Sequence, residues 1–119
     1  MARILIVDDE PEIRSSLNEA LSYVGHEVSE AQDGDEGIEA YQNSPSEIVI
    51  TDIHMTPKDG LELIGQLRIG DPQPKIIAMT GFGTLPLYAA RELGAGHIFS
   101  KPFPIEDMLG AVRELLDED

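Results

Sequence analysis

Strand-like and helix-like segments alternate along the whole chain, and this alternation restricts the fold more than any other feature. Short apolar or alternating runs predict strands at residues 3–7, 27–31, 47–51, 75–79 and 97–100. Segments with helical periodicity follow them at residues 11–24, 35–42, 60 to about 70, 85–93 and 104–116. Strands that alternate with helices through short connections predict an α/β sandwich built around a mostly parallel sheet.

Local signals mark where some of these helices begin. Asp9, Pro11 and Glu12 together predict the start of the first helix, because a capping acid, an early proline and an acid three positions after the cap are typical there. Thr84 is a candidate cap for the helix at 85–93.

Length and composition indicate one globular domain covering residues 1–119, with 41% hydrophobic and 26% charged residues. No apolar run approaches the length of a membrane span, and the first strand begins almost at the first residue. We therefore expect no signal peptide and a cytoplasmic location. The chain has no cysteine, which excludes disulfides, zinc–thiolate sites and thiol catalysis.

The formal net charge of −15 argues against two classes of partner. Nucleic-acid phosphates and anionic lipids would both be repelled, so neither direct nucleic-acid binding nor membrane binding is expected. The acidic surface has two explanations that the sequence leaves open. It can simply aid solubility, or it can select partners that carry basic docking patches.

Polar residues follow the predicted strands at the points where those strands end. Asp8 and Asp9 follow the first strand, Asp52 the third, Thr80 the fourth and Lys101 the fifth. Ligands of open parallel sheets bind beyond the carboxyl ends of the strands, so these side chains are expected to share one edge. Carboxylates gathered there would repel one another unless Lys101 and a hard divalent cation lay between them.

Each of these residues, taken alone, has a simpler explanation. Asp9 can be a helix cap, and Asp52 a turn residue at a strand end. Thr80 can be a solvated loop hydroxyl, and Lys101 an ordinary exposed lysine. Their convergence on one edge favours a functional site over four independent coincidences.

Several motifs make the chain similar to the receiver domains of bacterial two-component response regulators. They are the opening at residues 4–10, Asp52 with Asp59-Gly60, Thr80-Gly81, Gly94-Ala95, and Lys101-Pro102-Phe103. Each motif is weak alone, and together they cover essentially the whole chain. The resemblance implies a flavodoxin-like doubly wound (βα)5 sandwich with a five-stranded parallel sheet in the order 2-1-3-4-5. It also implies a receiver of the single-domain type.

The resemblance further implies that Asp52 accepts a phosphoryl group from a histidine kinase or a histidine phosphotransfer protein. The implied cofactor is Mg²⁺ or Mn²⁺, held directly by Asp9, Asp52 and the backbone carbonyl of His54, with Asp8 acting through a water molecule. Lys101 would pair with a phosphoryl oxygen, and Thr80 would donate a hydrogen bond to another.

The resemblance implies a cis peptide bond between Lys101 and Pro102, and a switch in which Thr80 moves toward the phosphoryl group. Relatives couple that movement to an aromatic residue at the position that Ile98 occupies here. Phe99 should point to the opposite face of its strand, because side chains alternate. We therefore expect the switch pair Thr80–Ile98 to differ from the usual threonine–aromatic pair.

Two loops also depart from the family's pattern. Thr56 replaces a frequent proline, and Pro57 follows one position later. His54 and Phe82 each lie two residues beyond a site residue, where side chains of relatives tune the access of water to the phosphoryl group. Phe82 is either such a shield or an ordinary loop residue.

A single-domain receiver acts by binding other proteins, and the expected output face consists of the fourth helix, the fifth strand and the fifth helix. The candidate residues of that face are Leu87, Tyr88, Arg91, Ile98, Met108 and Val112. We expect a monomer or a weak dimer. We also expect a signalling domain and not a turnover enzyme. The main alternative is a pseudo-receiver, a binding module that carries no phosphate. An aspartyl-phosphate phosphatase is disfavoured, because His54 stands where a second acid is usual.

Overall fold

The computed structural model describes residues 2–55, 58–81 and 85–118. The expectations for Thr56, Pro57, Phe82 and the Thr84 cap therefore concern residues outside the described ranges. The strands of the described chain are β1 (Arg3–Val7), β2 (Glu27–Ala31), β3 (Ile48–Asp52), β4 (Lys75–Thr80) and β5 (His97–Ser100). The helices are α1 (Pro11–Tyr23), α2 (Gly34–Asn43), α3 (Gly60–Arg68), α4 (Leu85–Glu92) and α5 (Ile105–Leu116).

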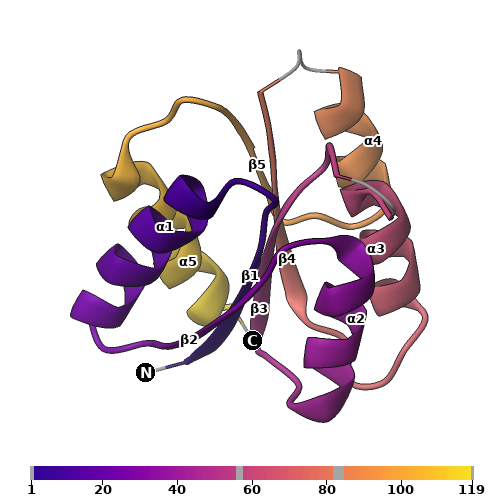
Figure 1. Ribbon diagram of the computed structural model, residues 1–119, viewed down its shortest axis with the longest axis horizontal. Coiled ribbons are helices and arrows are strands. Elements are labelled where there is room, and N and C mark those ends of the chain that lie inside the picture. The colour runs from indigo at the N-terminus through magenta and orange to yellow at the C-terminus, as the bar shows by residue number, and fades with distance from the viewer. Residues whose placement is uncertain (1, 56–57, 82–84, 119) are drawn as a thin grey trace.

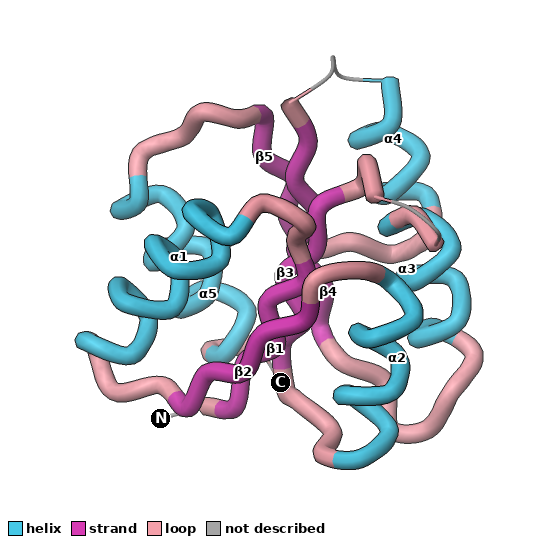
Figure 2. Tube along the Cα trace, in the orientation of Figure 1, coloured by secondary structure: helices cyan, strands magenta, loops and turns pink. Residues whose placement is uncertain are grey.

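The strands form one parallel sheet in the order β2-β1-β3-β4-β5. Helices α1 and α5 cover one face of this sheet, and α2, α3 and α4 cover the other (Figures 1 and 2). This arrangement confirms the predicted flavodoxin-like α/β fold and its strand order. It also brings the carboxyl ends of β1, β3, β4 and β5 to one edge.

The sheet separates two apolar layers, because successive strand side chains point to opposite faces. The α2–α4 layer contains Leu5, Val7, Ala31, Tyr41, Val49, Ile53, Met55, Leu63, Ile64, Leu67, Ile76, Ala78, Leu87, Ala90 and Ala95. The α1–α5 layer contains Ala2, Ile4, Ile6, Leu17, Leu21, Ile48, Ile50, Ile77, Met79, Met108, Ala111, Val112 and Leu115. The central strands are buried on both sides, which explains why their sequences are nearly continuous apolar runs.

Two strands end one residue later than expected, so that site residues are their last residues instead of following them. Asp52 is the last residue of β3 and pairs with Met79, and Thr80 is the last residue of β4 and pairs with Ser100. In the sequence, polar residues at these two positions are typical of loops. In the structure, their backbones are still paired with the neighbouring strand.

Helix α1 begins at Pro11 as predicted, but its cap differs from the prediction. Its N-cap is Glu10, which makes no side-chain capping hydrogen bond, and Pro11 is the first helical residue. Asp9 lies outside the cap, so the capping explanation for this residue is wrong. At this loop the Glu10 N–H donates to Oδ1 of Asp8 at 2.9 Å.

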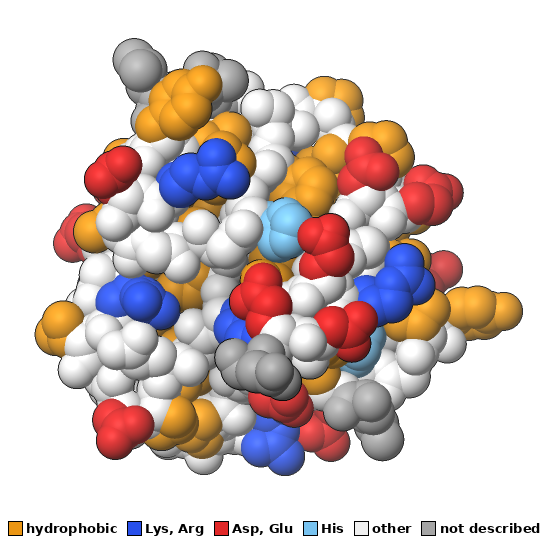
Figure 3. All heavy atoms as spheres, turned by 180° about the vertical axis from the view of Figure 1, so that it is seen from behind, with side chains coloured by type: hydrophobic (Ala, Val, Ile, Leu, Met, Phe, Trp, Pro, Cys, Tyr) orange, Lys and Arg blue, Asp and Glu red, His pale blue; other side chains and the backbone are white. Residues whose placement is uncertain are grey.

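No helix in the described ranges is long and apolar enough to span a membrane. The surface seen from behind in Figure 3 presents acidic, basic and hydrophobic side chains side by side. The excess of acidic groups is thus interrupted on this side of the molecule by basic and apolar groups.

Candidate functional site

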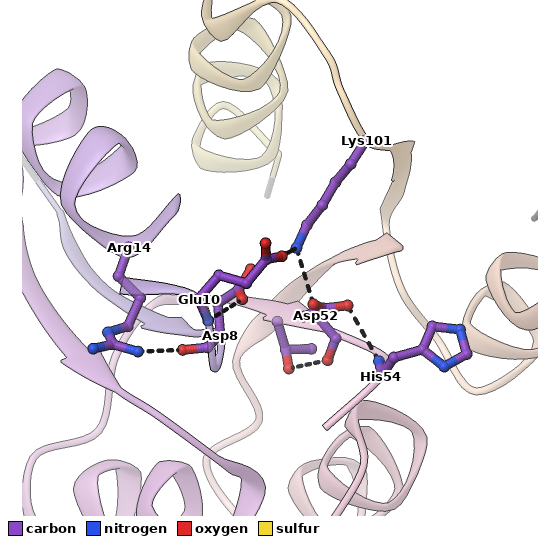
Figure 4. A network of polar contacts seen from close by, with 7 residues as sticks. Asp8, Glu10, Arg14, Asp52, His54 and Lys101 are labelled. Carbon is purple, nitrogen blue, oxygen red and sulfur yellow. Dashed lines mark hydrogen bonds and ion pairs between the residues drawn. The ribbon is translucent and has the colours of Figure 1, made fainter. Parts of the chain in front are cut away.

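The Lys101 ammonium lies at the centre of the polar edge of the sheet and bonds three carboxylates (Figure 4). Its Nζ atom is 2.8 Å from Oδ2 of Asp8, 2.9 Å from Oδ2 of Asp52 and 2.9 Å from Oε1 of Glu10. The side chains come from the end of β3 and from the segments that follow β1 and β5. The predicted convergence of Asp8, Asp52 and Lys101 therefore exists.

These charged groups are largely removed from water. The side chains of Asp8, Asp52 and Lys101 are 0%, 6% and 12% exposed. Burial raises the pKa of the Asp8 carboxyl, while the hydrogen bond from Lys101 opposes that rise. Burial alone would lower the pKa of Lys101, but hydrogen bonds to Asp8, Asp52 and Glu10 raise it well above the ordinary value. The site therefore favours the protonated, positively charged form of Lys101.

The backbone around Lys101 aims its side chain inward. The Lys101 N–H donates to the carbonyl of Thr80 at 2.8 Å, which continues the pairing of β5 with β4 beyond the last strand residue. The Lys101–Pro102 peptide bond is cis, as the resemblance implied. The backbone hydrogen bond to Thr80 places Lys101 at the same edge as Asp8 and Asp52.

Gly60 determines how α3 meets the end of β3. A Cβ atom on Gly60 would lie 2.2 Å from the carbonyl oxygen of Asp52 and 2.7 Å from the Cα of Ile53. The Gly60 N–H donates to the Ile53 carbonyl at 2.8 Å. Only glycine permits this approach, and it secures the helix against the strand that carries Asp52.

Both carboxylate oxygens of Asp52 accept hydrogen bonds. Oδ2 accepts from Lys101, and Oδ1 accepts from the backbone N–H of His54 at 3.1 Å. The His54 residue as a whole is exposed. These two donors fix the orientation of the carboxylate. Metal binding by the His54 carbonyl stays a prediction.

Four carboxylates are close enough to share one metal ion. One oxygen from each of Asp8, Asp9, Glu10 and Asp52 lies within 4.8 Å of the others. Lys101 supplies a single positive charge to this group, and oxygen ligands of this kind suit Mg²⁺ or Mn²⁺. The donor set therefore fits the predicted hard divalent cation.

Glu10 is the site residue that the sequence reasoning did not single out. It is the third of three consecutive acids after β1, and its carboxylate reaches Lys101 across the sheet edge. The run of three acids was the available signal, and in the structure both Asp8 and Glu10 bond Lys101.

The proposed switch residues lie on one face of the sheet. Thr80 is fully buried at the end of β4, and Ile98 packs against the α2–α4 layer. Phe99 packs against the α1–α5 layer, where its ring centroid is 5.1 Å from that of Phe103. The prediction that Ile98 and Phe99 point to opposite faces is confirmed.

Three of the six candidate output residues are buried and therefore do not lie on the surface. Leu87, Met108 and Val112 are buried in the apolar layers, because their helices turn these side chains toward the sheet. Tyr88 is 57% exposed and Arg91 is exposed, so these two remain available on α4.

A groove of about 520 Å³ opens beside the carboxylate cluster. Glu10, Asp52 and Lys101 line its polar end, and apolar side chains of α1 and of the segment after β5 line the rest. The lining residues are Glu10, Ile13, Ser16, Leu17, Asp52, Gly81, Lys101, Pro102, Phe103 and Ile105. The groove gives Asp52 and Lys101 a route to solvent.

Comparisons of the sequence with known proteins agree with this geometry. The response regulator receiver domain family matches residues 4–113. Response regulator MprA from Mycobacterium sp. (strain KMS) is 37% identical over 115 residues, which are 96% of this chain and 50% of that protein. Sporulation initiation phosphotransferase F from Bacillus subtilis (strain 168) is 32% identical over 115 residues, covering 96% of this chain and 93% of that protein. The chain thus spans about half the length of the MprA relatives that it matches.

Solved structures share the same architecture. A CheY-like response regulator receiver domain protein from Methanospirillum hungatei JF-1 superposes with a TM-score of 0.93 at 31% identity, covering 98% of this chain and 94% of that one. The receiver domain of NtrX from Brucella abortus gives a TM-score of 0.91 at 28% identity, with coverages of 98% and 99%. Fold, sequence match and the three-carboxylate lysine cluster lead to one conclusion: the chain belongs to the family of response regulator receiver domains.

Proposed function

We propose that Asp52 accepts a phosphoryl group from a phosphohistidine on a histidine kinase or a histidine phosphotransfer protein. The observation that carries the proposal is the Lys101 ammonium, which bonds both Asp52 and the buried Asp8. An acceptor carboxylate beside a fixed cation suits phosphoryl transfer, because catalysis of this reaction consists mostly of positioning and charge neutralisation.

In the proposed reaction a carboxylate oxygen of Asp52 attacks phosphorus in line with the bond to the histidine nitrogen. The P–O bond forms as the P–N bond breaks, and the electron pair of the broken bond returns to the imidazole nitrogen. Lys101 stabilises negative charge on a phosphoryl oxygen, and Thr80 donates a hydrogen bond to another. The backbone N–H of His54, now bonded to Oδ1 of Asp52, keeps the carboxylate oriented.

Asp9, Asp52 and the His54 carbonyl would hold Mg²⁺ or Mn²⁺, with Asp8 acting through water. When bound, the metal ion neutralises charge on the acceptor and on the phosphoryl oxygens. Without it, four carboxylates share the single charge of Lys101. The fully buried Asp8 would gain most from a second cation.

The proposed output is a conformational change in which Thr80 moves and alters the face formed by α4, β5 and α5. Exposed Tyr88 and Arg91 are the proposed contacts for a downstream protein. The chain would promote its own phosphorylation and dephosphorylation without turning over a separate substrate. We place this activity in the cytoplasm, where histidine kinases of two-component systems act.

The test is incubation with acetyl phosphate and Mg²⁺, followed by intact mass measurement. The parent should gain the mass of one phosphoryl group, and Asp52→Asn should gain none. Asp107→Asn serves as a matched control, because Asp107 is an exposed acid in the first turn of α5. An adduct of equal yield on Asp52→Asn would reject the assignment of the acceptor.

A pseudo-receiver predicts a different result. The parent would then remain unmodified with acetyl phosphate and with a panel of phosphorylated histidine kinases, and it would bind no beryllofluoride in the presence of Mg²⁺. Beryllofluoride binding without an adduct would instead indicate an intact site that needs its cognate kinase.

A further inference from the structure

We propose that Glu10 is a positioning residue that holds the Lys101 ammonium until a phosphoryl group replaces it. The inference rests on the proposed phosphoryl transfer to Asp52. It assigns a role to a side chain that the aspartate, threonine and lysine roles described above leave unused.

The hydrogen bonds of Lys101 are already fully used. An ammonium group has three N–H donors. In this structure Asp8, Asp52 and Glu10 accept at 2.8, 2.9 and 2.9 Å. A phosphoryl oxygen that pairs with Lys101 must therefore take the place of one of these carboxylates.

Glu10 is the carboxylate that can move away from Lys101 at the lowest cost in free energy. Asp8 is fully buried, and its second oxygen accepts from the Glu10 N–H at 2.9 Å. Asp52 is 6% exposed, and its second oxygen accepts from the His54 N–H at 3.1 Å. The Glu10 side chain is 55% exposed, so water can solvate its carboxylate as soon as it leaves Lys101.

The local backbone explains why the Glu10 side chain is available for this role. Glu10 is the N-cap of α1 but makes no side-chain hydrogen bond to the helix, and Pro11 follows it. Glutamate is a poor N-cap compared with aspartate or serine. The carboxylate consequently extends toward Lys101 instead of folding back onto α1 (Figure 4).

Glu10 also lies where an incoming anion would arrive. It lines the same groove as Asp52 and Lys101, and its side chain is 55% exposed. A phosphoryl group in this groove would compete with the Glu10 carboxylate for one ammonium donor. Glu10 should therefore weaken the binding of phosphoryl groups and their mimics.

The experiment measures the affinity of the full chain for beryllofluoride by titration calorimetry at saturating Mg²⁺. Glu10→Gln should bind beryllofluoride about two- to fivefold more tightly than the parent, the range expected when a partly exposed ion pair is removed. Glu12→Gln is the matched control, because it removes one nearby exposed carboxylate from the first turn of α1. The control should match the parent within the error of the titration.

Glu10→Asp separates contact from charge. Aspartate at the N-cap position prefers to accept from the helix N–H groups, and it is one methylene shorter. This variant keeps the net charge of the parent but should lose the contact with Lys101, so it should bind beryllofluoride as tightly as Glu10→Gln. Higher salt should reduce the difference between the parent and both variants, because it screens the exposed pair.

Unchanged or weaker beryllofluoride binding by Glu10→Gln at saturating Mg²⁺ would overturn the proposal. If that variant required more Mg²⁺ for saturation yet bound beryllofluoride like the parent, Glu10 would serve the metal ion instead of Lys101. Failure of the proposed function is distinguishable, since the parent itself would then bind no beryllofluoride.

Discussion

The Lys101 ammonium lies 2.8 Å from Oδ2 of Asp8, whose side chain is fully buried, although 93 positions separate the two residues. Lys101→Met would leave buried carboxylates without their cation, so we expect a loss of about 3 kcal/mol in the free energy of unfolding. Urea unfolding in EDTA measures this loss. Lys58→Met removes a cation whose partner Asp35 is 61% exposed, and it should cost below about 1 kcal/mol. Equal losses for the two variants would contradict the special role of Lys101.

Stability without metal should depend on pH through Asp8. Burial raises the pKa of Asp8 above the ordinary 3.8, although the hydrogen bond from Lys101 opposes the rise. The folded protein therefore binds this proton more tightly than the unfolded chain does. Its contribution to stability is complete below the ordinary carboxyl pKa and is lost as pH rises through the raised pKa.

Asp8→Asn tests this sign, because asparagine mimics the neutral carboxyl group and does not titrate. In EDTA, the stability of Asp8→Asn relative to the parent should increase as pH rises from the ordinary carboxyl pKa through the raised one. It should then level off. Urea unfolding at a series of pH values measures the difference, and a difference independent of pH would contradict the prediction.

Mg²⁺ should stabilise the folded protein through the carboxylate cluster. At about ten times its Kd, a ligand adds about 1.4 kcal/mol, which corresponds to a rise in Tm of roughly 5 °C. Asp9→Ala should abolish most of this rise, because Asp9 contributes one oxygen to the four-carboxylate cluster. Thermal unfolding with and without Mg²⁺ measures the effect. The variant Glu19→Ala, an exposed position on α1, should respond like the parent.

Gly60→Ala should be strongly destabilising, because its Cβ would lie 2.2 Å from the Asp52 carbonyl oxygen. We expect a loss of about 3 kcal/mol from this overpacking, together with weaker Mg²⁺ binding as the end of β3 shifts. Gly65→Ala in the same helix is the control. A Cβ there meets nothing within 4 Å, so this change should stabilise by about 0.5 to 1 kcal/mol. Urea unfolding compares the two, and similar values would contradict the steric argument.

The fold could be predicted because its local signals agree with its global pattern. The strand at 97–100 is predicted to the residue, and the alternation of strands and helices determines the parallel sheet. The site could be predicted for a related reason. Parallel strands bring their carboxyl ends to one edge, so residues far apart in sequence must meet there.

Other features depended on geometry that the sequence pattern does not contain. Asp52 and Thr80 are the last residues of their strands, because backbone pairing includes them although their side chains are polar. The Glu10 carboxylate bonds Lys101 and makes no capping hydrogen bond to α1, which the residue pattern did not indicate. Leu87 is buried because the rotation of α4 about its axis is set by packing against the sheet.

The division of the interior into two layers has a practical consequence for watching this protein at work. Ile98 and Phe99 are neighbours on β5, yet they pack into different layers. The chain contains no tryptophan, so a single indole at either position would be an unambiguous fluorophore. Two single-tryptophan variants would therefore report separately on the two halves of the molecule, and their time courses would show which half responds first.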